Sequence, residues 1–175
     1  MINNKWIIKK DLKEYIFESI EEKFGTAKYN AVSSFACGNE SMDRFLHQSA
    51  YMSSLEFDAH TKLVLNDKGV IVAYVTTLMD TIEVNNDKFL CLNMARIGVH
   101  LDHQEKGIGS MIIEFVKELT KTVSVRYIVL DALCEKKEWY EDRGFIPLKD
   151  EEGPFVYMYC DMLDEGLVTS LYDNP

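Results

Sequence analysis

The stretch from Ala95 to Ile113, ARIGVHLDHQEKGIGSMII, constrains the fold more than any other part of the chain. It passes from an apolar segment through a short polar loop into residues at helical spacing, with Gln104, Gly107 and Gly109 at the junction. A helix that starts in this way leaves its first amides without helical partners, and those amides and the helix dipole favour an anion. The two glycines let a phosphate approach the backbone closely, because no Cβ stands in the way. The junction therefore predicts a phosphate site, and the alternative is a helix start packed tightly against its strand.

The junction follows the pattern Gln-x-x-Gly-x-Gly, beginning at Gln104. This is neither the G-x-x-x-x-G-K-[ST] of a P-loop nor the G-x-G-x-x-G of a dinucleotide-binding fold. The identity of the ligand therefore depends on the rest of the chain.

Apolar periodicity and turn residues predict the other secondary structure elements. Residues 9–25 follow a helical pattern that places Leu12 and Tyr15 on one face, and Gly25 is a stop signal. The sequence predicts helices over residues 9–25, 41–52, 107–120 and 135–145, and strands over residues 62–65, 70–82, 88–99, 125–133 and 153–160. Strands thus come first as a meander and then as β-α-β-α-β. That order indicates an α/β fold with a mixed sheet flanked by helices.

Three short features set the ends of these elements. Ser41 is the expected N-cap of the helix over residues 41–52. Residues 66–69 and 85–87 are polar turns between apolar segments. The inward-facing residues of the 41–52 helix are expected to be Phe45, Leu46, Ala50 and Tyr51.

The composition indicates one soluble globular domain over residues 1–175. This length suffices for one full core and is short for two, and neither a linker nor a repeat divides the chain. No apolar run has the length of a membrane span, and the N-terminus lacks the continuous apolar core of a signal peptide. The four cysteines form no C-x-x-C pair, a pattern typical of reduced thiols. We therefore expect a cytoplasmic protein.

The net charge of −10 is concentrated near the end of the chain. Residues 146–175 carry Lys149 against seven acidic side chains. Proteins that bind nucleic acids gain affinity from a basic footprint that releases counterions. The sequence offers no obvious footprint of this kind, which argues against a nucleic-acid partner, although a basic patch can still assemble in space.

Two motifs in the correct order give the chain a resemblance to a known family. The loop from Gln104 to Gly109 matches [RQ]-x-x-G-x-[GA], and residues 139–145, WYEDRGF, match an aromatic-Tyr-x-x-x-Gly-Phe element. With these motifs the chain resembles the GNAT superfamily of N-acetyltransferases over residues 61–160. The resemblance implies a mixed sheet with a V-shaped splay at an acetyl-CoA site. It also implies direct transfer of the acetyl group to the primary amine of a small molecule or peptide.

The resemblance assigns cofactor-binding roles to the junction. The pyrophosphate of coenzyme A would lie on the amides from Glu105 to Ser110. The pantetheine arm would pair with the strand at Ile97, Gly98 and Val99, as a peptide adds to a sheet edge. The same amides can stabilise the oxyanion of the attacked thioester, and the alternative for the strand residues is core packing. The candidate cofactor-binding residues are Ile97, Gly98, Val99, Gln104, Glu105, Lys106, Gly107, Ile108, Gly109 and Ser110.

Tyr140 is the candidate general acid, because the matching tyrosine of the family is often aimed at the departing thiolate. A phenol with a pKa of about 10 can supply the proton that this thiolate needs. The alternative is a tyrosine packed in the core beside Trp139 and Phe145. No side chain is an obvious general base, and water, a backbone carbonyl or Glu83 could take the proton of the amine.

The residues also indicate a subgroup of the family and an alternative, non-catalytic function. Residues 35–50, FACGNESMDRFLHQSA, resemble the F-x-C-G…L-x-x-F-L opening of GNAT proteins from toxin–antitoxin modules, with Met42 near the expected leucine. In that subgroup the acceptor is the amine of an aminoacyl-tRNA, a partner that the acidic charge disfavours here. The rival is a non-catalytic acyl-CoA-binding module. It is supported by Leu133 and Lys136, which stand where the family commonly has Asn and Ala, and by the carboxylate of Glu105 near the phosphate site.

Three further groups of residues carry weaker signals. His100, Asp102 and His103 are joined by no further ligand motif, so we expect a solvated loop without a metal. Cys91 and Cys134 lack a paired base and are not expected to be nucleophiles. The C-terminal tail either is a solvated terminus or docks on a second subunit of a homodimer. The apolar residues of that tail are Leu163, Leu167, Val168 and Leu171.

Overall fold

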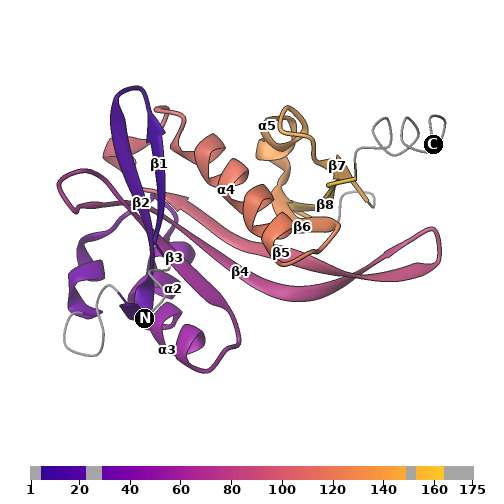
Figure 1. Cartoon of the computed structure of the whole chain (residues 1–175), viewed down its shortest axis with the longest axis horizontal. Helices are drawn as coiled ribbons and strands as arrows, with labels where there is room; N and C mark the ends of the chain where they lie inside the picture. The colour runs from indigo at the N-terminus through magenta and orange to yellow at the C-terminus, as the bar shows by residue number, and fades with distance from the viewer. Residues whose placement is uncertain (1–4, 23–28, 149–152, 164–175) are drawn as a thin grey trace, which may run out of the picture. The chain divides into compact units, whose positions relative to one another are not determined.

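The computed structural model describes residues 5–22, 29–148 and 153–163 (Figure 1). The strands are β1 (Trp6–Lys10), β2 (Lys13–Ser19), β3 (His60–Leu65), β4 (Ile71–Val84), β5 (Asp87–Val99), β6 (Tyr127–Leu133), β7 (Ile146–Pro147) and β8 (Phe155–Asp161). The α-helices are α2 (Glu40–Gln48), α3 (Ala50–Leu55), α4 (Ile108–Thr122) and α5 (Lys137–Glu141). Short 3-10 helices cover Tyr29–Ser34, Leu101–His103 and Cys134–Lys136.

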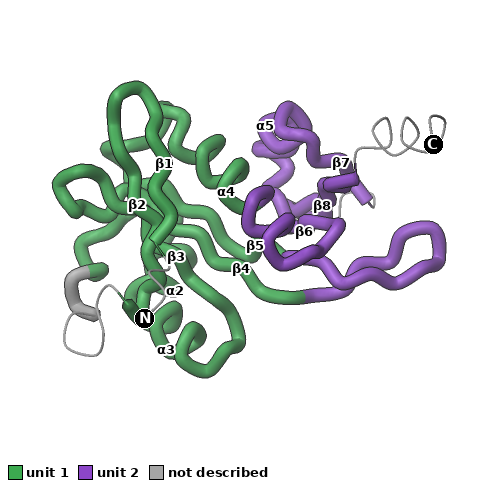
Figure 2. Tube along the Cα trace, viewed as in Figure 1, with its two compact units in different colours: residues 1–79, 93–116 green, residues 80–92, 117–175 purple. Residues whose placement is uncertain are grey.

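The chain forms two compact units, and β4, β5 and α4 run through both (Figure 2). Unit 1 consists of residues 1–79 and 93–116, and unit 2 consists of residues 80–92 and 117–175. The strands are hydrogen-bonded in the order β1-β2-β3-β4-β5-β6-β8-β7. β5 and β6 are neighbours in the sheet, and α4 connects them as the crossover that a parallel strand pair needs. The sheet also contains antiparallel pairs, such as β1 with β2 and β6 with β8. The predicted α/β fold with a mixed sheet flanked by helices is confirmed, and the V-shaped splay stays a prediction.

The helix predicted over residues 9–25 is wrong up to Ser19, and of its described part residues 20–22 alone are helical. The chain instead forms the hairpin of β1 and β2, whose last antiparallel pair is Lys10↔Lys13. Asp11 and Leu12 make the turn between them with φ values of 48° and 64°. Two successive residues with positive φ form a type I′ turn, whose twist matches that of the flanking strands.

Aromatic and β-branched residues explain why the hairpin prevails over the helical spacing. Tyr15 and Phe17 alternate with less buried neighbours along β2 and are 7% and 0% exposed, so the period of two buries one face. Leu12, which the predicted helix would bury, is fully exposed at the turn. Phe24 and Gly25, the predicted end of that helix, lie outside the described residues.

The helix predicted over residues 41–52 consists of two helices, α2 and α3, which are separated at Ser49. The N-cap of α2 is Asn39, whose side-chain oxygen accepts a hydrogen bond from the amide of Met42 at 3.2 Å. The predicted N-cap Ser41 is therefore wrong, because it lies inside the helix. Among the predicted inward-facing residues, Leu46, Ala50 and Tyr51 are buried and Phe45 is partly buried.

The predicted turns between strands are present. The turn from Asn66 to Gly69 joins β3 to β4, and Gly69 has a φ of 73°. Asn85 and Asn86, with φ values of 55° and 68°, join β4 to β5 as a two-residue turn. Asp87 belongs to β5 and not to the turn.

The remaining predicted elements are present with shifted ends. α4 covers the helix predicted over residues 107–120, and β6 and β8 cover the two last predicted strands. The helix predicted over residues 135–145 is shorter, because a 3-10 turn precedes α5. Nothing in the sequence predicts the two-residue strand β7, since Ile146-Pro147 has no alternating pattern and proline lacks an amide donor.

Unit 1 buries apolar side chains on both faces of its strands. On one face, Leu46 of α2 packs in a cluster with Leu63 and Tyr74. Side chains alternate along a strand, and on the other face the ring of Phe17 stacks on Phe115 of α4 with centroids 4.2 Å apart. This packing holds the end of β5 and the start of α4, where the predicted phosphate loop lies.

Unit 2 has an apolar cluster of its own, in which Ile82 and Cys91 pack with Tyr127 and Val129 of β6. The guanidinium of Arg126 links the start of β6 to β8 in this unit. Its Nε and Nη2 donate to the two carboxylate oxygens of Asp161 of β8, at 2.8 and 2.6 Å.

Most of the predicted docking tail lies outside the described residues. Leu163 is described and is 40% exposed, whereas Leu167, Val168 and Leu171 are not described. The homodimer therefore stays a prediction. In the described ranges, no helix combines the length and the apolar character that crossing a membrane requires. All four cysteines are free thiols, as expected.

Candidate functional site

The predicted strand–loop–helix junction lies within unit 1. β5 ends at Val99, a 3-10 turn follows, and α4 begins at Ile108. Gly107 has a φ of 72°, in the left-handed region that favours glycine, and Glu105 adopts a similar φ of 59° with an exposed side chain. The glycine of the motif is therefore required by the backbone at the start of the helix.

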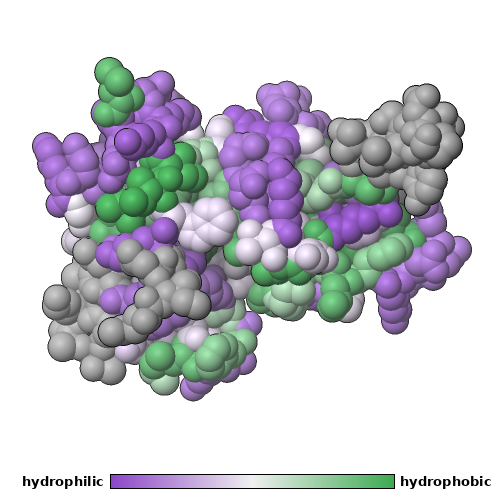
Figure 3. Space-filling view, in the orientation of Figure 1, coloured by the Kyte–Doolittle hydropathy of each residue, from purple (hydrophilic) through white to green (hydrophobic). Residues whose placement is uncertain are grey.

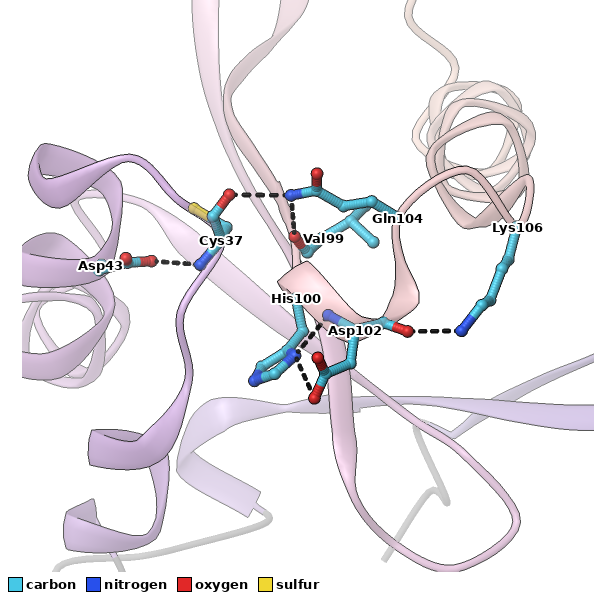
Figure 4. A network of polar contacts seen from close by, with 7 residues as sticks. All are labelled: Cys37, Asp43, Val99, His100, Asp102, Gln104 and Lys106. Carbon is cyan, nitrogen blue, oxygen red and sulfur yellow. Dashed lines mark hydrogen bonds and ion pairs between the residues drawn. The ribbon is translucent and has the colours of Figure 1, made fainter.

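The side chain of Gln104 fixes the loop to two other segments (Figure 4). Its Nε2 donates hydrogen bonds to the carbonyl oxygens of Cys37 at 2.9 Å and of Val99 at 3.0 Å. The amide of Cys37 in turn donates to Oδ1 of Asp43 in α2 at 2.9 Å. The stretch with the toxin-like resemblance, residues 35–50, is thus linked to the loop through Gln104, whose side chain positions the loop.

The first turn of α4 presents amides that no helix carbonyl accepts. Met111 is the first residue to donate a helical bond, from its amide to the carbonyl of Gly107 at 3.1 Å. The amides of Ile108 and Gly109 precede it and have no carbonyl four residues earlier within the helix. Ser110 takes part in an interaction of its own. The amides that the predicted anion site requires are present, and the binding of an anion there stays a prediction.

Lys10 reaches this loop from the N-terminal hairpin. Its Nζ donates a hydrogen bond to the carbonyl oxygen of Gly107 at 2.9 Å, across 97 residues of sequence. A Cβ built on Gly107 would lie 2.1 Å from that nitrogen, so a side chain there would displace the lysine. The sequence did not predict this residue, because a helix over residues 9–25 leaves Lys10 far from any strand. Two short runs of aromatic and β-branched residues, at 6–8 and 15–17, flank a polar segment and are the signal that could have placed it in a hairpin.

The strand residues predicted to pair with the pantetheine arm alternate between half-buried and buried positions. Ile97 and Val99 are half-buried, whereas Gly98 is buried against the ring of Tyr74. A Cβ on Gly98 would lie 2.6 Å from Cε1 of that ring. The carbonyl of Val99 already accepts a hydrogen bond from Gln104 and keeps one lone pair for a ligand.

The loop carries charges of both signs, because Asp102 and Glu105 are exposed carboxylates beside Lys106. Lys106 is held on the loop by a hydrogen bond from its Nζ to the carbonyl of Asp102. Burial, together with the nearby charges of Lys106 and Lys13, lowers the pKa of His103. The lowered pKa favours the neutral form of His103, so Lys10 and Lys106 are the cations that oppose the two carboxylates.

Tyr140 lies in unit 2 and combines a buried ring with an available hydroxyl. The ring packs edge-on against Trp139 and Phe145, with centroids 4.8 and 5.7 Å away, and the residue is 8% exposed. Burial raises the pKa of Tyr140 to about 12, so the phenol keeps its proton at neutral pH. Within the described residues, the hydroxyl has no hydrogen-bond partner, and it is not among the fully buried unpaired atoms. Core packing of the ring and proton donation by the hydroxyl are thus compatible.

Other candidate groups of unit 2 carry less chemistry. Glu83 is exposed on β4, and its position gives no reason to prefer it as the general base. Burial raises the pKa of Cys91 to about 11, which keeps the thiol protonated and agrees with its expected lack of nucleophilicity. Leu133 is half-buried at the end of β6, and Lys136 is exposed. Among the described residues, no three His, Cys, Asp or Glu side chains are arranged to hold a metal ion.

Comparisons with solved structures show the same fold in several bacterial toxins. A structure described as a bacterial toxin has a TM-score of 0.72 at 17% identity, and the match covers 92% of this chain and 97% of that one. A tyrosine-to-phenylalanine mutant of the toxin AtaT, bound to acetyl-CoA and the C-terminus of the antitoxin AtaR, has a TM-score of 0.69 at 16% identity, with 89% and 98% covered. AtaT complexed with acetyl-methionyl-tRNAfMet has a TM-score of 0.68 at 15% identity, with 90% and 99% covered.

Sequence comparison identifies the family. No curated protein sequence matches the chain. The profile of the acetyltransferase (GNAT) domain matches residues 58–147, about half of the chain, and includes both the loop that begins at Gln104 and the element that contains Tyr140. The chain therefore belongs to the GNAT acetyltransferase family.

Proposed function

We propose that the chain is an acetyl-CoA-dependent N-acetyltransferase whose loop from Gln104 to Ser110 holds the pyrophosphate of the cofactor. The observation that carries the proposal is the start of α4, where the amides of Ile108 and Gly109 precede the first helical hydrogen bond. A phosphate at this point would accept hydrogen bonds from them and interact with the positive end of a 15-residue helix. An AtaT structure of the same fold holds acetyl-CoA, which supports this choice of cofactor.

Tyr140 is proposed as the general acid. The amine first loses a proton to water or another base, and its nitrogen then attacks the carbonyl carbon of the thioester. A C–N bond forms, the nitrogen gives up a second proton to solvent, and the tetrahedral intermediate collapses with cleavage of the C–S bond. The electron pair goes to sulfur, which takes the proton of the Tyr140 hydroxyl, and the phenolate regains a proton from solvent. A site that raises the pKa of the phenol also disfavours a free thiolate, so the proton is transferred as the bond breaks.

The acceptor is proposed to be the primary amine of a small molecule or peptide. The amine of an aminoacyl-tRNA is a second candidate, and it is favoured by the link from Gln104 to Cys37, which joins the loop to the toxin-like stretch of residues 35–50. AtaT, a neighbour of the same fold, has been solved with acetyl-methionyl-tRNAfMet. The acidic excess of the chain is the observation against this acceptor.

We also propose that residues 1–175 act as one domain in the cytoplasm. The family match runs from residue 58 to residue 147 and so passes through parts of both compact units. Four free cysteines are typical of a reducing compartment.

The test combines calorimetry with a turnover assay. Wild type and a Tyr140→Phe variant are titrated with acetyl-CoA, and release of the CoA thiol is followed with an amine library and with aminoacyl-tRNA. Tyr157→Phe is the matched control, because it removes a phenol of the same unit whose pKa is also raised to about 12. We expect Tyr140→Phe to keep its affinity and to lower kcat by roughly a hundredfold or more, the usual contribution of a general acid.

The outcomes separate the alternatives. A wild type that does not bind acetyl-CoA would refute the proposed function. Binding without release of thiol from any amine would support the non-catalytic acyl-CoA-binding module. Full turnover in Tyr140→Phe would show that another group protonates the sulfur.

A further inference from the structure

The hairpin of β1 and β2 lies along α4 with its tip near the start of that helix. Trp6, at the beginning of β1, packs edge-on against Phe115, with ring centroids 5.6 Å apart. Four residues later, Lys10 reaches the carbonyl of Gly107. Four steps along a strand cover about 13 Å, and eight steps back along the helix cover about 12 Å, so the two contacts fit one straight alignment. The position of Lys10 is therefore fixed by the packing of the hairpin.

Positive charges gather at this tip. Lys13 is directly opposite Lys10 in the register of the hairpin. Figure 3 shows hydrophilic surface, coloured alike for acidic and basic residues, beside the hydrophobic end of the hairpin. Lys13 and Lys106 both act on His103 through their charges, which puts them near the same loop. The cluster of Lys10, Lys13 and Lys106 thus combines β1, β2 and the junction loop.

This arrangement is unfavourable without an anion. Like charges directly opposite each other destabilise a strand pair. A cation at the N-terminal end of a helix also opposes the helix dipole. In the part of the chain that the structure describes, neither Lys10 nor Lys13 forms an ion pair with a carboxylate. Lys10 uses one of its three N–H groups on Gly107 and keeps two for a ligand.

We infer that the N-terminal hairpin is part of the cofactor site, with Lys10 binding the phosphate groups of coenzyme A from the side and Lys13 and Lys106 adding to the positive field. The inference rests on the proposed function, because it places the pyrophosphate at the start of α4. It adds a specificity element that acts on the nucleotide part of the cofactor and not on the thioester.

The experiment compares Lys10→Gln with Lys9→Gln. Lys9 is the neighbouring residue on the opposite face of β1 and is exposed, so both variants lose the same charge at adjacent positions. Acetyl-CoA binding is measured by calorimetry at about 50 mM and about 300 mM salt, since screening weakens contacts between exposed charges. Turnover is measured with acetyl-CoA and with S-acetylpantetheine, which carries the thioester without the nucleotide phosphates. Thermal unfolding confirms that each variant is folded.

Lys10→Gln is expected to raise the Kd for acetyl-CoA roughly tenfold or more at low salt, as loss of a charged hydrogen bond does, while Lys9→Gln changes it less than about twofold. The KM for S-acetylpantetheine stays unchanged in Lys10→Gln. Lys10→Arg restores most of the affinity, because a guanidinium also binds phosphate.

Equal Kd values for Lys10→Gln and Lys9→Gln, in a wild type that binds acetyl-CoA, would overturn the inference and leave the proposed function standing. An equal loss for acetyl-CoA and S-acetylpantetheine would also overturn it, since Lys10 would then only support the fold of the loop. A wild type that does not bind acetyl-CoA would overturn both.

Discussion

Gly98→Ala is expected to destabilise unit 1 because the added methyl group would overlap a ring that has no room to move. The new Cβ would lie 2.6 Å from Cε1 of Tyr74, and two further ring atoms would lie at 3.1 and 3.3 Å. Ordinary contacts begin near 3.4 Å, so the overlap at the closest atom is about 0.8 Å. The ring is fully buried, and its hydroxyl donates to the carbonyl of Met42 at 2.9 Å. It also packs edge-on against Phe35.

Two opposing terms set the magnitude. Overpacking of a filled core costs about 1–3 kcal/mol. The backbone of Gly98 is not in the left-handed region, so alanine also stabilises the fold by about 0.4–1 kcal/mol through the lower entropy of the unfolded chain. We therefore expect the free energy of unfolding to fall by about 1–2 kcal/mol.

Urea unfolding can report on unit 1 alone, because the two tryptophans of the chain lie in different units. Trp6 is in unit 1 and Trp139 is in unit 2. A Trp139→Phe background leaves Trp6 as the fluorophore, and Gly98→Ala is measured in it with and without Tyr74→Leu. If steric overlap is the cause, the cost of Gly98→Ala disappears when the ring is absent. The same cost in both backgrounds, or no cost in the first, would refute the reasoning.

Two further predictions concern the dependence of stability on pH. Burial lowers the pKa of His60, and the charge of Lys62 lowers it further, so the unfolded chain binds this proton more readily than the folded one. Stability should therefore fall as the pH decreases below about 6.5, and urea midpoints between about pH 5 and pH 7 should change less in His60→Gln. The hydrogen bonds from Arg126 lower the pKa of Asp161, so its contribution is present above about pH 4 and is lost as the pH falls through the folded pKa. Asp161→Asn should cost about 1 kcal/mol at pH 7 and almost nothing in acid, as followed by thermal unfolding; an equal cost at both pH values would contradict the ion pair.

The part of the fold that the sequence predicts well is the part where local signals agree with tertiary packing. At the junction after Val99, the apolar strand, the polar loop and the helical spacing all indicate the same structure, and the backbone of Gly107 requires the residue that the motif contains. The turns at Asn66–Gly69 and at Asn85 are also set by local chemistry, because these residue types accept positive φ. Such features need no knowledge of what packs against them.

In the N-terminal hairpin, the local sequence signals do not agree with the tertiary packing. Leu12 at positive φ is a poor turn residue by itself, and the spacing of Leu12, Tyr15 and Ile16 fits a helix as well as a strand. What selects the strand is the stacking of Phe17 on Phe115, a contact between residues almost a hundred positions apart. Single-sequence patterns contain no information about such a partner.

The same missing contact hides Lys10, the residue that we propose to bind the cofactor. Lys10 reaches the phosphate loop only because the hairpin lies along α4, so an error in one local element removes a cation from the candidate site. The prediction of Gln104 illustrates the reverse case. The motif singles out Gln104 as a cofactor-binding residue, which stays a prediction, and in the structure its side chain donates hydrogen bonds to the carbonyls of Cys37 and Val99 and so positions the loop. A motif thus indicates where a ligand would bind. Which of its residues contact the ligand and which hold the loop in place depends on segments that the motif does not include.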